Sequence, residues 1–412
     1  MNFDTICVVG LGYIGLPTAT MFASRRKKVI GVDVNQHAVD TINRGEIHIV
    51  EPELDIAVHA AVKEGYLRAT TRPEPADAFL VAVPTPFKKG QKEDEIPTPD
   101  LSYIQSAADS IAPMLKKGNL VILESTSPVG ATEKMADWLS NARPDLTFPQ
   151  QAGDQADIMI AHCPERVLPG RIMHELIEND RIVGGMTEHS GRAACDLYKT
   201  FVRGECLLTN ARTAEMAKLT ENAFRDVNIA FANELSMICA DVNIDVRELI
   251  SLANKHPRVN ILQPGPGVGG HCIAVDPWFI ISANSNLARV MFQARSVNNY
   301  KRVWVKERLV EEISKRNYKK VLFCGLTYKA NIDDVRSSPA LDIVKEIASS
   351  GVCIVAVYEP NLFELPESID GLDIDWVRDI RDVSEYDQVF VLVSHDECKY
   401  YLNDKSNVAW WS

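Results

Sequence analysis

The sequence predicts an α/β protein with two doubly wound domains, each built on a parallel sheet, joined by a central helical region. Two observations support this prediction. Short apolar runs alternate with helical patterns near both ends of the chain, and this alternation is typical of parallel sheets. Between them, about thirty residues from Thr213 onward contain no glycine or proline and repeat apolar residues at helical spacing.

The first domain is assigned to residues 1–210. It opens with a buried strand over Thr5–Val9, a glycine turn, and a helix that begins near Ile14. The run KKVIGVDVN predicts a second strand that ends at Asp33, and AFLVAVPTP and NLVILESTSPVG predict two more. Helical stretches separate these runs, so the strands are expected to lie parallel.

The other two regions follow from the same patterns. Residues 211–305 predict a long helix followed by further helices. Strand patterns return at KKVLFCGLTY, VCIVAVYEP and YDQVFVLVS, so residues 306–412 predict a second α/β domain.

Composition and charge narrow the function classes. The 412 residues exceed what one core normally serves. With 44 Lys and Arg against 56 Asp and Glu, the net charge of −12 disfavours nucleic acid or an anionic membrane as partner, since either requires a basic face. No apolar run is long enough to insert in a membrane. Nine scattered cysteines without a C-x-x-C pair predict free thiols in a cytoplasmic protein, and no residue spacing predicts a metal site.

A glycine-rich turn indicates a dinucleotide site. Gly10-x-Gly12-x-x-Gly15 follows the first predicted strand and opens the first predicted helix, and Asp33 ends the next strand. Such glycines permit a tight turn, a close approach of the pyrophosphate, and close helix packing. A carboxylate at the ribose hydroxyls repels a 2′-phosphate, so NAD is predicted over NADP. This context makes the first α/β domain Rossmann-like, and the second α/β domain, with the same alternation of strands and helices, is expected to be Rossmann-like as well.

A second glycine-rich segment, PGPGVGGHCIAVDP, presents a single cysteine. Cys272 is either a packed apolar side chain, as the other cysteines are expected to be, or a nucleophile on a loop whose glycines allow close approach. Asp276 could orient a base or a water molecule. Cys163, in CPERVLPG, is the alternative nucleophile, but no glycine run presents it, so it is interpreted as packing. His271 is interpreted as structural.

The long predicted helix carries a polar triplet. Lys218, Asn222 and Arg225 are spaced i, i+4 and i+7, which places them on one helix face. Most triplets of this kind form a solvated polar face. Here the helix is otherwise apolar, which favours a binding surface.

Seven motifs together resemble one family. GLGYIGLP, VAVPTP, ESTSPVGAT, CPERVLPG, AEMAKLTENAFRDVNIAFANE, GVGGHCIAVDP and GLTYKANIDDVRSSPA occur in the order found in the UDP-glucose/GDP-mannose dehydrogenase family, over almost the whole chain. The resemblance implies an NAD-dependent, four-electron oxidation of a nucleotide sugar to a uronate for bacterial surface polysaccharide. The segment NKHPRVNILQPGPGVGGHC is most similar to the branch acting on UDP-N-acetyl-D-mannosamine. UDP-GlcNAc, UDP-GalNAc and GDP-mannose are the alternative substrates.

The resemblance also implies roles for individual residues. Cys272 would form a thiohemiacetal and then a thioester, with Lys218 stabilising oxyanion character and transferring protons. Glu165 would act as general base or orient water. The other residues expected in catalysis are Asn222, Asp276 and Thr126.

The resemblance also implies which residues contact each of the two ligands. Residues expected at NAD are Gly10, Gly12, Tyr13, Ile14, Gly15, Asp33, Thr85, Thr126 and Arg336. Residues expected at the nucleotide sugar are Arg166, Val167, Lys218, Asn222, Arg225, His256, Arg258, Gly269 and Lys329. His256 and Arg258 resemble residues that reach a neighbouring subunit's substrate, which implies a homodimer with a shared site, formed through the central helical region.

Two departures from the family pattern stand out. Val275 occupies the place of a lysine found in members that act on glucose, which favours the N-acetylhexosamine branch. The final residues, YYLNDKSNVAWWS, lack the pattern of the strand that usually closes the last domain. Two rival functions remain at this point. One is a two-electron β-hydroxyacid-type dehydrogenase, and the other is a non-catalytic NAD or nucleotide-sugar sensor.

Overall fold

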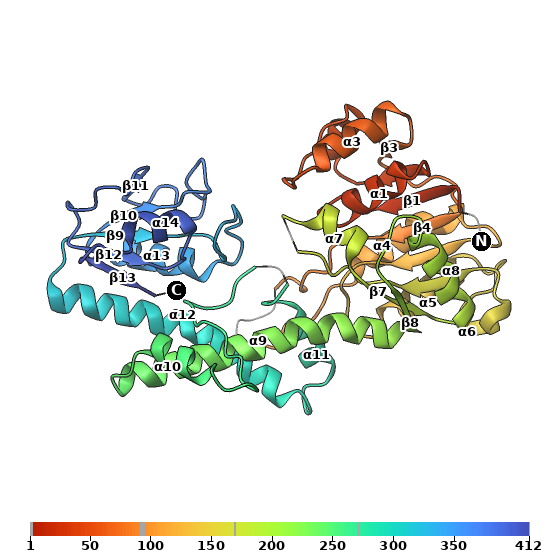
Figure 1. The fold of residues 1–412 in the computed structure, drawn as a ribbon. Helices are drawn as coiled ribbons and strands as arrows, with labels where there is room; N and C mark the ends of the chain where they lie inside the picture. The colour runs from red at the N-terminus through yellow and green to blue at the C-terminus, as the bar shows by residue number, and fades with distance from the viewer. Residues whose placement is uncertain (1–2, 91–94, 169, 271, 412) are drawn as a thin grey trace. The chain divides into compact units, whose positions relative to one another are not determined.

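The computed structural model describes residues 3–90, 95–168, 170–270 and 272–411. These residues form two compact units, Met1–Thr220 and Glu221–Ser412, which are described separately below (Figure 1). The boundary falls inside the long helix α9 (Ala211–Asp241). Among the described residues, no helix combines the length and apolar character that a membrane crossing requires.

The first unit contains an eight-stranded sheet. Its strands in spatial order are β3 (Leu67–Thr70), β2 (Lys28–Val32), β1 (Thr5–Val9), β4 (Ala78–Val81), β5 (Leu120–Leu123), β6 (Met159–His162), β7 (Arg181–Gly185) and β8 (Cys206–Asn210). All neighbours are parallel except β6 and β7. The strand order reverses between β1 and β4, the topological position where such sheets bind dinucleotides.

Helices cover both faces of this sheet because its strands are apolar on both sides. In β1, Ile6 and Val8 belong to one buried core and Cys7 and Val9 to the other. The helices on the first core are α1 (Gly15–Ser24), α3 (Leu54–Lys63), α7 (Ile172–Glu178) and α8 (Glu188–Tyr198). Those on the second are α4 (Ser102–Ile111) and α5 (Ala131–Ala142). The remaining short segments are α2 (Gln36–Asn43), whose Val39 and Ile42 also belong to the first core, α6 (Pro149–Ala152), η1 (Ala112–Met114) and η2 (Gly153–Gln155).

The second unit begins with helices. They are the rest of α9, then α10 (Val246–Ala253), α11 (Asp276–Ala283) and α12 (Arg289–Arg316). A buried ion pair joins α9 to α12, with 2.7 Å between Asp226 Oδ1 and Arg295 Nη1. Asn298 Nδ2 also donates to Asp226 Oδ1 at 2.7 Å. Because a buried charge is costly without a partner, these contacts restrict how the two helices pack.

A five-stranded parallel sheet completes the second unit. Its spatial order is β11 (Ile374–Val377), β10 (Ile354–Tyr358), β9 (Lys320–Cys324), β12 (Gln388–Val391) and β13 (Val408–Trp410). Helix α13 (Pro339–Ser350) and the end of α12 cover one face, and α14 (Asp396–Leu402) packs on the other. The predicted fold class, two doubly wound α/β domains with a helical region between them, is therefore confirmed.

The expectation for the last residues was wrong. Val408–Trp410 forms a parallel edge strand on β12, so the final sheet does have a closing strand. Val408 and Trp410 pack on one core while Ala409 and Trp411 pack on the other. Three residues are too few to show strand periodicity in the sequence, and only pairing with β12 reveals it.

Candidate active site

The turn after β1 has the geometry of a dinucleotide turn. Gly10 has φ +93°, and a Cβ there would lie 2.5 Å from the carbonyl oxygen of Ala82. A Cβ on Gly15 would lie 1.8 Å from the oxygen of Gly10. In contrast, a Cβ on Gly12 would meet nothing within 4 Å. Gly10 and Gly15 are therefore required by protein packing, and Gly12 is where a ligand can approach the backbone.

Asp33 and Thr85 fit a bound NAD. Asp33 lies directly after β2, where its Oδ2 accepts from the backbone N–H of Leu11 at 2.9 Å and its Oδ1 from that of Asn35 at 2.9 Å. These bonds hold the carboxylate beside the glycine turn while leaving it partly exposed. The hydroxyl of Thr85, which follows β4, is buried without a hydrogen-bond partner among the described residues. The prediction of NAD thus agrees with the residues present.

The remaining residues expected at NAD in this unit lie on the same turns. Tyr13 is exposed, with 38% of its surface accessible, and Ile14 immediately precedes α1. Thr126 follows β5 and is partly buried. The carboxyl ends of parallel strands meet at one sheet edge, so Thr126 shares that edge with the glycine turn.

Glu165 follows β6, and donors within the protein bind both of its carboxylate oxygens. Its Oε2 lies 2.6 Å from Nη2 of Arg181, and its Oε1 accepts from the backbone N–H of Arg166 at 2.7 Å. Both carboxylate oxygens are therefore already engaged by donors within the protein. Of the two roles expected for Glu165, orienting a water molecule fits this geometry better than general base. Arg166 and Val167 are partly buried beside it.

A second carboxyl shares the same guanidinium. Glu124 Oε1 lies 4.0 Å from Nη1 of Arg181 and accepts from the hydroxyl of Tyr198 at 2.6 Å. Burial raises the pKa of Glu124 to about 7, although Arg181 and Tyr198 act in the opposite direction. Arg181 therefore pairs with Glu165, and Glu124 holds its proton in acid.

Cys163 is a packing residue, as expected. Its side chain is fully buried, and Arg181 Nη1 donates to its sulfur at 3.7 Å. Burial raises the pKa of this thiol to about 12, so little reactive thiolate forms near neutral pH.

Cys272 is exposed on the loop before α11, in contrast. Its carbonyl oxygen accepts from the backbone N–H groups of Val275 at 3.1 Å and Asp276 at 2.8 Å, closing a turn onto the helix. The buried carboxylate of Asp276 accepts from Asn222 Nδ2 at 2.5 Å. The structure thus brings together three residues expected in catalysis: an exposed thiol, a buried carboxylate, and an amide from α9. His271 lies outside the described residues.

The glycines before Cys272 have a partner that the sequence did not indicate. A Cβ on Gly269 would lie 2.3 Å from the oxygen of Ser337, and one on Gly270, which has φ +81°, would lie 2.8 Å from the ring of Tyr328. A Cβ on Gly267 would lie 3.0 Å from the side chain of Pro339. We expected these glycines to admit ligands. The structure shows that their missing side chains admit the segment between β9 and α13 together with the first residue of α13.

Other predicted residues lie elsewhere on α9 and on the loop after α10. Lys218 is partly buried on α9, one turn before Asn222, and Arg225 is exposed. His256 and Arg258 are exposed on the loop after α10, where the backbone N–H of Arg258 donates to His256 Nδ1 at 3.3 Å.

Two predicted residues lie on the loop between β9 and α13. Lys329 is exposed, and its carbonyl oxygen accepts from Thr327 Oγ1 at 2.9 Å. Arg336 makes a two-pronged ion pair with Asp334, at 2.8 Å and 2.7 Å. The contacts of Arg336 to NAD and of Lys329 to the sugar nucleotide stay predictions.

Several buried polar residues that organise these loops were missed from sequence. Asn233 Nδ2 donates to Asn298 Oδ1 at 2.9 Å, and Asn233 Oδ1 accepts from the backbone N–H of Gly265 at 2.9 Å, which ties the cysteine loop to α9 and α12. In the first unit, Glu215 accepts from the backbone N–H groups of Gly130 and Thr132. For Asn233, a polar residue within a largely apolar helical stretch was the available signal.

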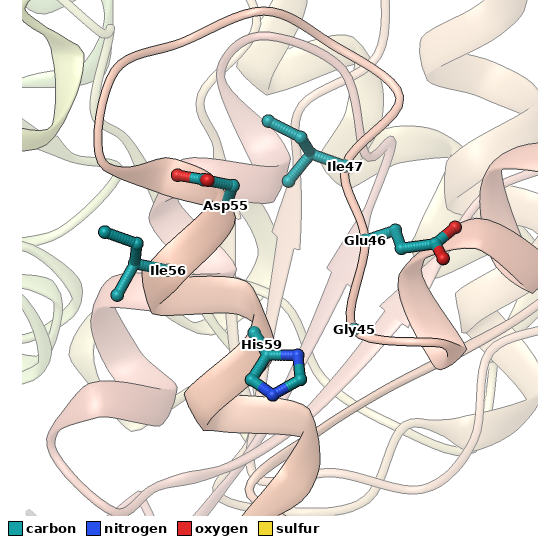
Figure 2. A pocket seen from close by; sticks show the side chains of 6 residues that line it. All are labelled: Gly45, Glu46, Ile47, Asp55, Ile56 and His59. Carbon is teal, nitrogen blue, oxygen red and sulfur yellow. The ribbon is translucent and has the colours of Figure 1, made fainter.

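A surface depression lies elsewhere in the first unit. Figure 2 shows it between the segment after α2 and helix α3, lined by Gly45, Glu46, Ile47, Asp55, Ile56 and His59. None of these residues was predicted to bind NAD or substrate. The described parts of the chain also hold no group of three or more His, Cys, Asp or Glu side chains that could bind a metal ion.

The dinucleotide turn of the first unit has the geometry of an NAD-dependent dehydrogenase. The chain belongs to the UDP-glucose/GDP-mannose dehydrogenase family, whose NAD-binding, central and UDP-binding domain models match residues 4–202, 212–300 and 322–409.

Relatives and solved structures agree with this assignment. A UDP-N-acetyl-D-mannosamine dehydrogenase of Yersinia pestis is 60% identical over 100% of this chain and 98% of that protein. An NDP-N-acetyl-D-galactosaminuronic acid dehydrogenase of Ralstonia nicotianae is 59% identical over 98% and 94%. A solved UDP-N-acetyl-mannosamine dehydrogenase from S. aureus has a TM-score of 0.84 at 43% identity, covering 98% of this chain and 92% of that one.

Proposed function

We propose that this enzyme oxidises UDP-N-acetyl-D-mannosamine to UDP-N-acetyl-D-mannosaminuronate in two NAD-dependent steps, with Cys272 as the nucleophile. The observation that carries this proposal is the turn that joins Cys272 to Asp276, together with the 2.5 Å bond from Asn222 to that carboxylate. A two-electron dehydrogenase needs no thiol, and a binding protein needs neither group. The cluster therefore favours covalent catalysis over both rivals.

The chemistry balances with the residues present. The primary alcohol loses a hydride and a proton to become an aldehyde, and Cys272 Sγ then adds to the aldehyde carbon as a thiohemiacetal. Loss of a second hydride and proton leaves a thioester, which water hydrolyses to the carboxylate with release of the thiol. NAD supplies the hydride acceptor for both oxidations.

Other side chains are assigned to supporting roles in this scheme. Lys218 stabilises oxyanion character and transfers protons, while Asn222 holds Asp276, which orients the hydrolytic water. Thr126 is a further polar residue assigned to catalysis. Glu165, fixed by its ion pair, orients water as well.

The choice of sugar rests on the relatives. Proteins about equally identical to this chain are named for N-acetyl-D-mannosamine and for N-acetyl-D-galactosaminuronic acid, so identity alone does not separate these two sugars. The HPRVN segment supports the mannosamine substrate, and Val275 supports an N-acetylhexosamine over glucose. The N-acetylgalactosamine nucleotide is the second candidate, supported by the Ralstonia relative.

Assembly and cellular context complete the proposal. Phe224, Phe231 and Ile238 are each more than half exposed at helical spacing along α9, and a second subunit would bury such an apolar stripe. We therefore assign a homodimer, with His256 and Arg258 directed to the partner's substrate. Nine free cysteines support a cytoplasmic location. The family resemblance alone supports a role in bacterial surface polysaccharide synthesis.

The test is the stoichiometry of NADH per sugar consumed, measured with the UDP derivatives of N-acetylmannosamine, N-acetylglucosamine and N-acetylgalactosamine, and with GDP-mannose and UDP-glucose. The proposal expects two NADH for each UDP-N-acetyl-D-mannosamine and the highest kcat/KM for that substrate. One NADH per sugar would contradict the four-electron scheme. A higher kcat/KM for the N-acetylgalactosamine nucleotide would establish the second candidate.

A further inference from the structure

The turn after β9 repeats the turn after β1. Gly325 has φ +90° and Gly10 has φ +93°. The backbone N–H of Leu326 donates to the carboxylate of Glu359, after β10, at 2.8 Å, as that of Leu11 donates to Asp33 in the first unit. The second unit thus carries a carboxylate at the position that takes the ribose in dinucleotide-binding sheets.

Glu359 cannot serve a ribose in that way, because its bonding capacity is used within the protein. It is 2% exposed, whereas Asp33 is partly exposed. Its Oε2 accepts from the backbone N–H groups of Leu326 and Thr327, and its Oε1 accepts from that of Asn361 at 3.0 Å. A carboxylate with this many donors holds a loop in place.

His395 continues this arrangement. Its ring is 1% exposed, with Nε2 at 3.0 Å from Glu359 Oε2. The backbone N–H of Asn331 donates to Nδ1 at 3.0 Å. A backbone amide can only donate, so Nδ1 carries the lone pair and Nε2 carries the proton that Glu359 accepts.

Glu359 and His395 bind opposite ends of one loop, residues 326–331. Glu359 accepts from its first two residues, and His395 accepts from Asn331 at its end. Within it, Tyr328 packs its ring on Gly270 of the cysteine loop, and the carbonyl of Lys329 is fixed by Thr327. Asn331 has φ +62° and is held at the start of α14, where its side-chain oxygen accepts from the backbone N–H of Asp396 at 3.0 Å.

We propose that Glu359 and His395 are positioning residues that hold the 326–331 loop so that Lys329 meets the nucleotide part of the substrate. This inference deepens the proposed function and rests on it for the role of Lys329. The UDP-binding domain model covers the loop and both positioning residues, which points to UDP as the part of the substrate involved.

The experiment measures binding of UDP alone to the full-length protein by calorimetry. Glu359→Gln removes the charge and leaves facing N–H groups with fewer acceptors, which should raise the Kd for UDP about tenfold. His395→Gln places an amide near the Nε2 position but leaves the N–H of Asn331 without its acceptor, so a similar rise is expected. NAD binding should be unchanged in both variants.

A double-mutant comparison with Lys329→Ala distinguishes positioning of Lys329 from general damage to the fold. In a Lys329→Ala background, adding Glu359→Gln should change the Kd by less than about twofold, because both act through one contact. Glu385→Gln is the matched control. It removes a carboxylate in the same domain that pairs with Lys320 at the surface, at 2.7 Å, and should leave UDP binding unaltered.

Three results would overturn the inference: an unchanged Kd in Glu359→Gln, full additivity with Lys329→Ala, or equal weakening by Glu385→Gln. If circular dichroism shows that Glu359→Gln does not fold, His395→Gln is judged by the same criteria in its place. The readout needs no turnover. Wild-type protein that binds UDP but oxidises no sugar of the panel would refute the proposed function while leaving this test intact.

Discussion

Replacing Glu124 by glutamine should change how the stability of the enzyme depends on pH. Glu124 is fully buried, and burial raises its pKa to about 7 from an ordinary 4.5. Its Oε1 accepts from the hydroxyl of Tyr198 at 2.6 Å, a bond that the amide oxygen of Gln can keep. Glutamine therefore imitates the protonated carboxyl and lacks only its titration.

The sign and size of this change in the free energy of unfolding follow from proton linkage. Between pH 4.5 and about 7, the folded protein holds the proton on Glu124 while the unfolded chain has released it, so stability falls as pH rises. The contribution is complete below pH 4.5 and lost above about 7. A shift of this size corresponds to about 3 kcal/mol in the free energy of unfolding. Glu124→Gln should gain that amount relative to wild type across this window.

Urea unfolding of both proteins, followed by circular dichroism at pH values spaced from about 4.5 to 8, measures this difference. Glu178→Gln is the matched control, since Glu178 lies exposed in an ion pair with Arg203 and should show no comparable trend. A constant difference between wild type and Glu124→Gln over the whole range would refute the assignment of a buried, protonated Glu124. A trend of the opposite sign would do the same.

Other predictions test the two ligand sites and the loop between them. Asp33→Ser should weaken use of NAD and narrow the gap to NADP in kcat/KM, and a wild-type preference for NADP would show that Asp33 is misassigned. Cys272→Ser should bind NAD normally but release uronate more slowly, by on the order of 10³-fold or more. Intact-mass measurement of this variant checks for a trapped sugar ester. Undiminished production of two NADH per sugar by Cys272→Ala would rule out the thioester route. Mixing Arg258→Ala with Cys272→Ala subunits should restore activity, and verified mixed dimers without recovery would count against a shared site. Gly270→Ala, at φ +81° against the ring of Tyr328, should cost roughly 1–3 kcal/mol of stability, seen as a lower Tm.

The first α/β domain was predictable because its signals are local. Thr5–Val9 is a strand as predicted, Lys28–Val32 ends one residue before Asp33, and α1 starts at Gly15. Apolar runs of this kind form buried parallel strands whatever lies elsewhere in the chain. The glycine turn was equally local, since the φ of Gly10 and the packing of Gly15 depend on neighbouring residues and one adjacent strand.

The site was predictable in its residue types and only partly in its contacts. Cys272 and Asp276 were both named from the sequence, and the structure joins them by a backbone turn at the start of α11, while their catalytic roles stay predictions. The bond from Asn222 to Asp276 joins residues 54 positions apart, so no local pattern could indicate it. The glycine run was recognised, but the residues it packs against, Tyr328 and Ser337, lie far along the chain.

The sequence by itself determined the two α/β domains and the NAD turn, because each depends on short-range backbone conformation and apolar periodicity. Whether Cys272 is packed or exposed was left open by the sequence, and the structure exposes it. Tertiary structure alone decided which carboxylates are paired. Glu165 forms an ion pair with Arg181, whereas burial raises the pKa of the neighbouring Glu124. Glu359 accepts hydrogen bonds from a loop of the protein, whereas Asp33, at the matching position of the first unit, stays partly exposed. The state of a buried charge depends on donors and burial supplied by distant segments, and these exist only once the chain has folded.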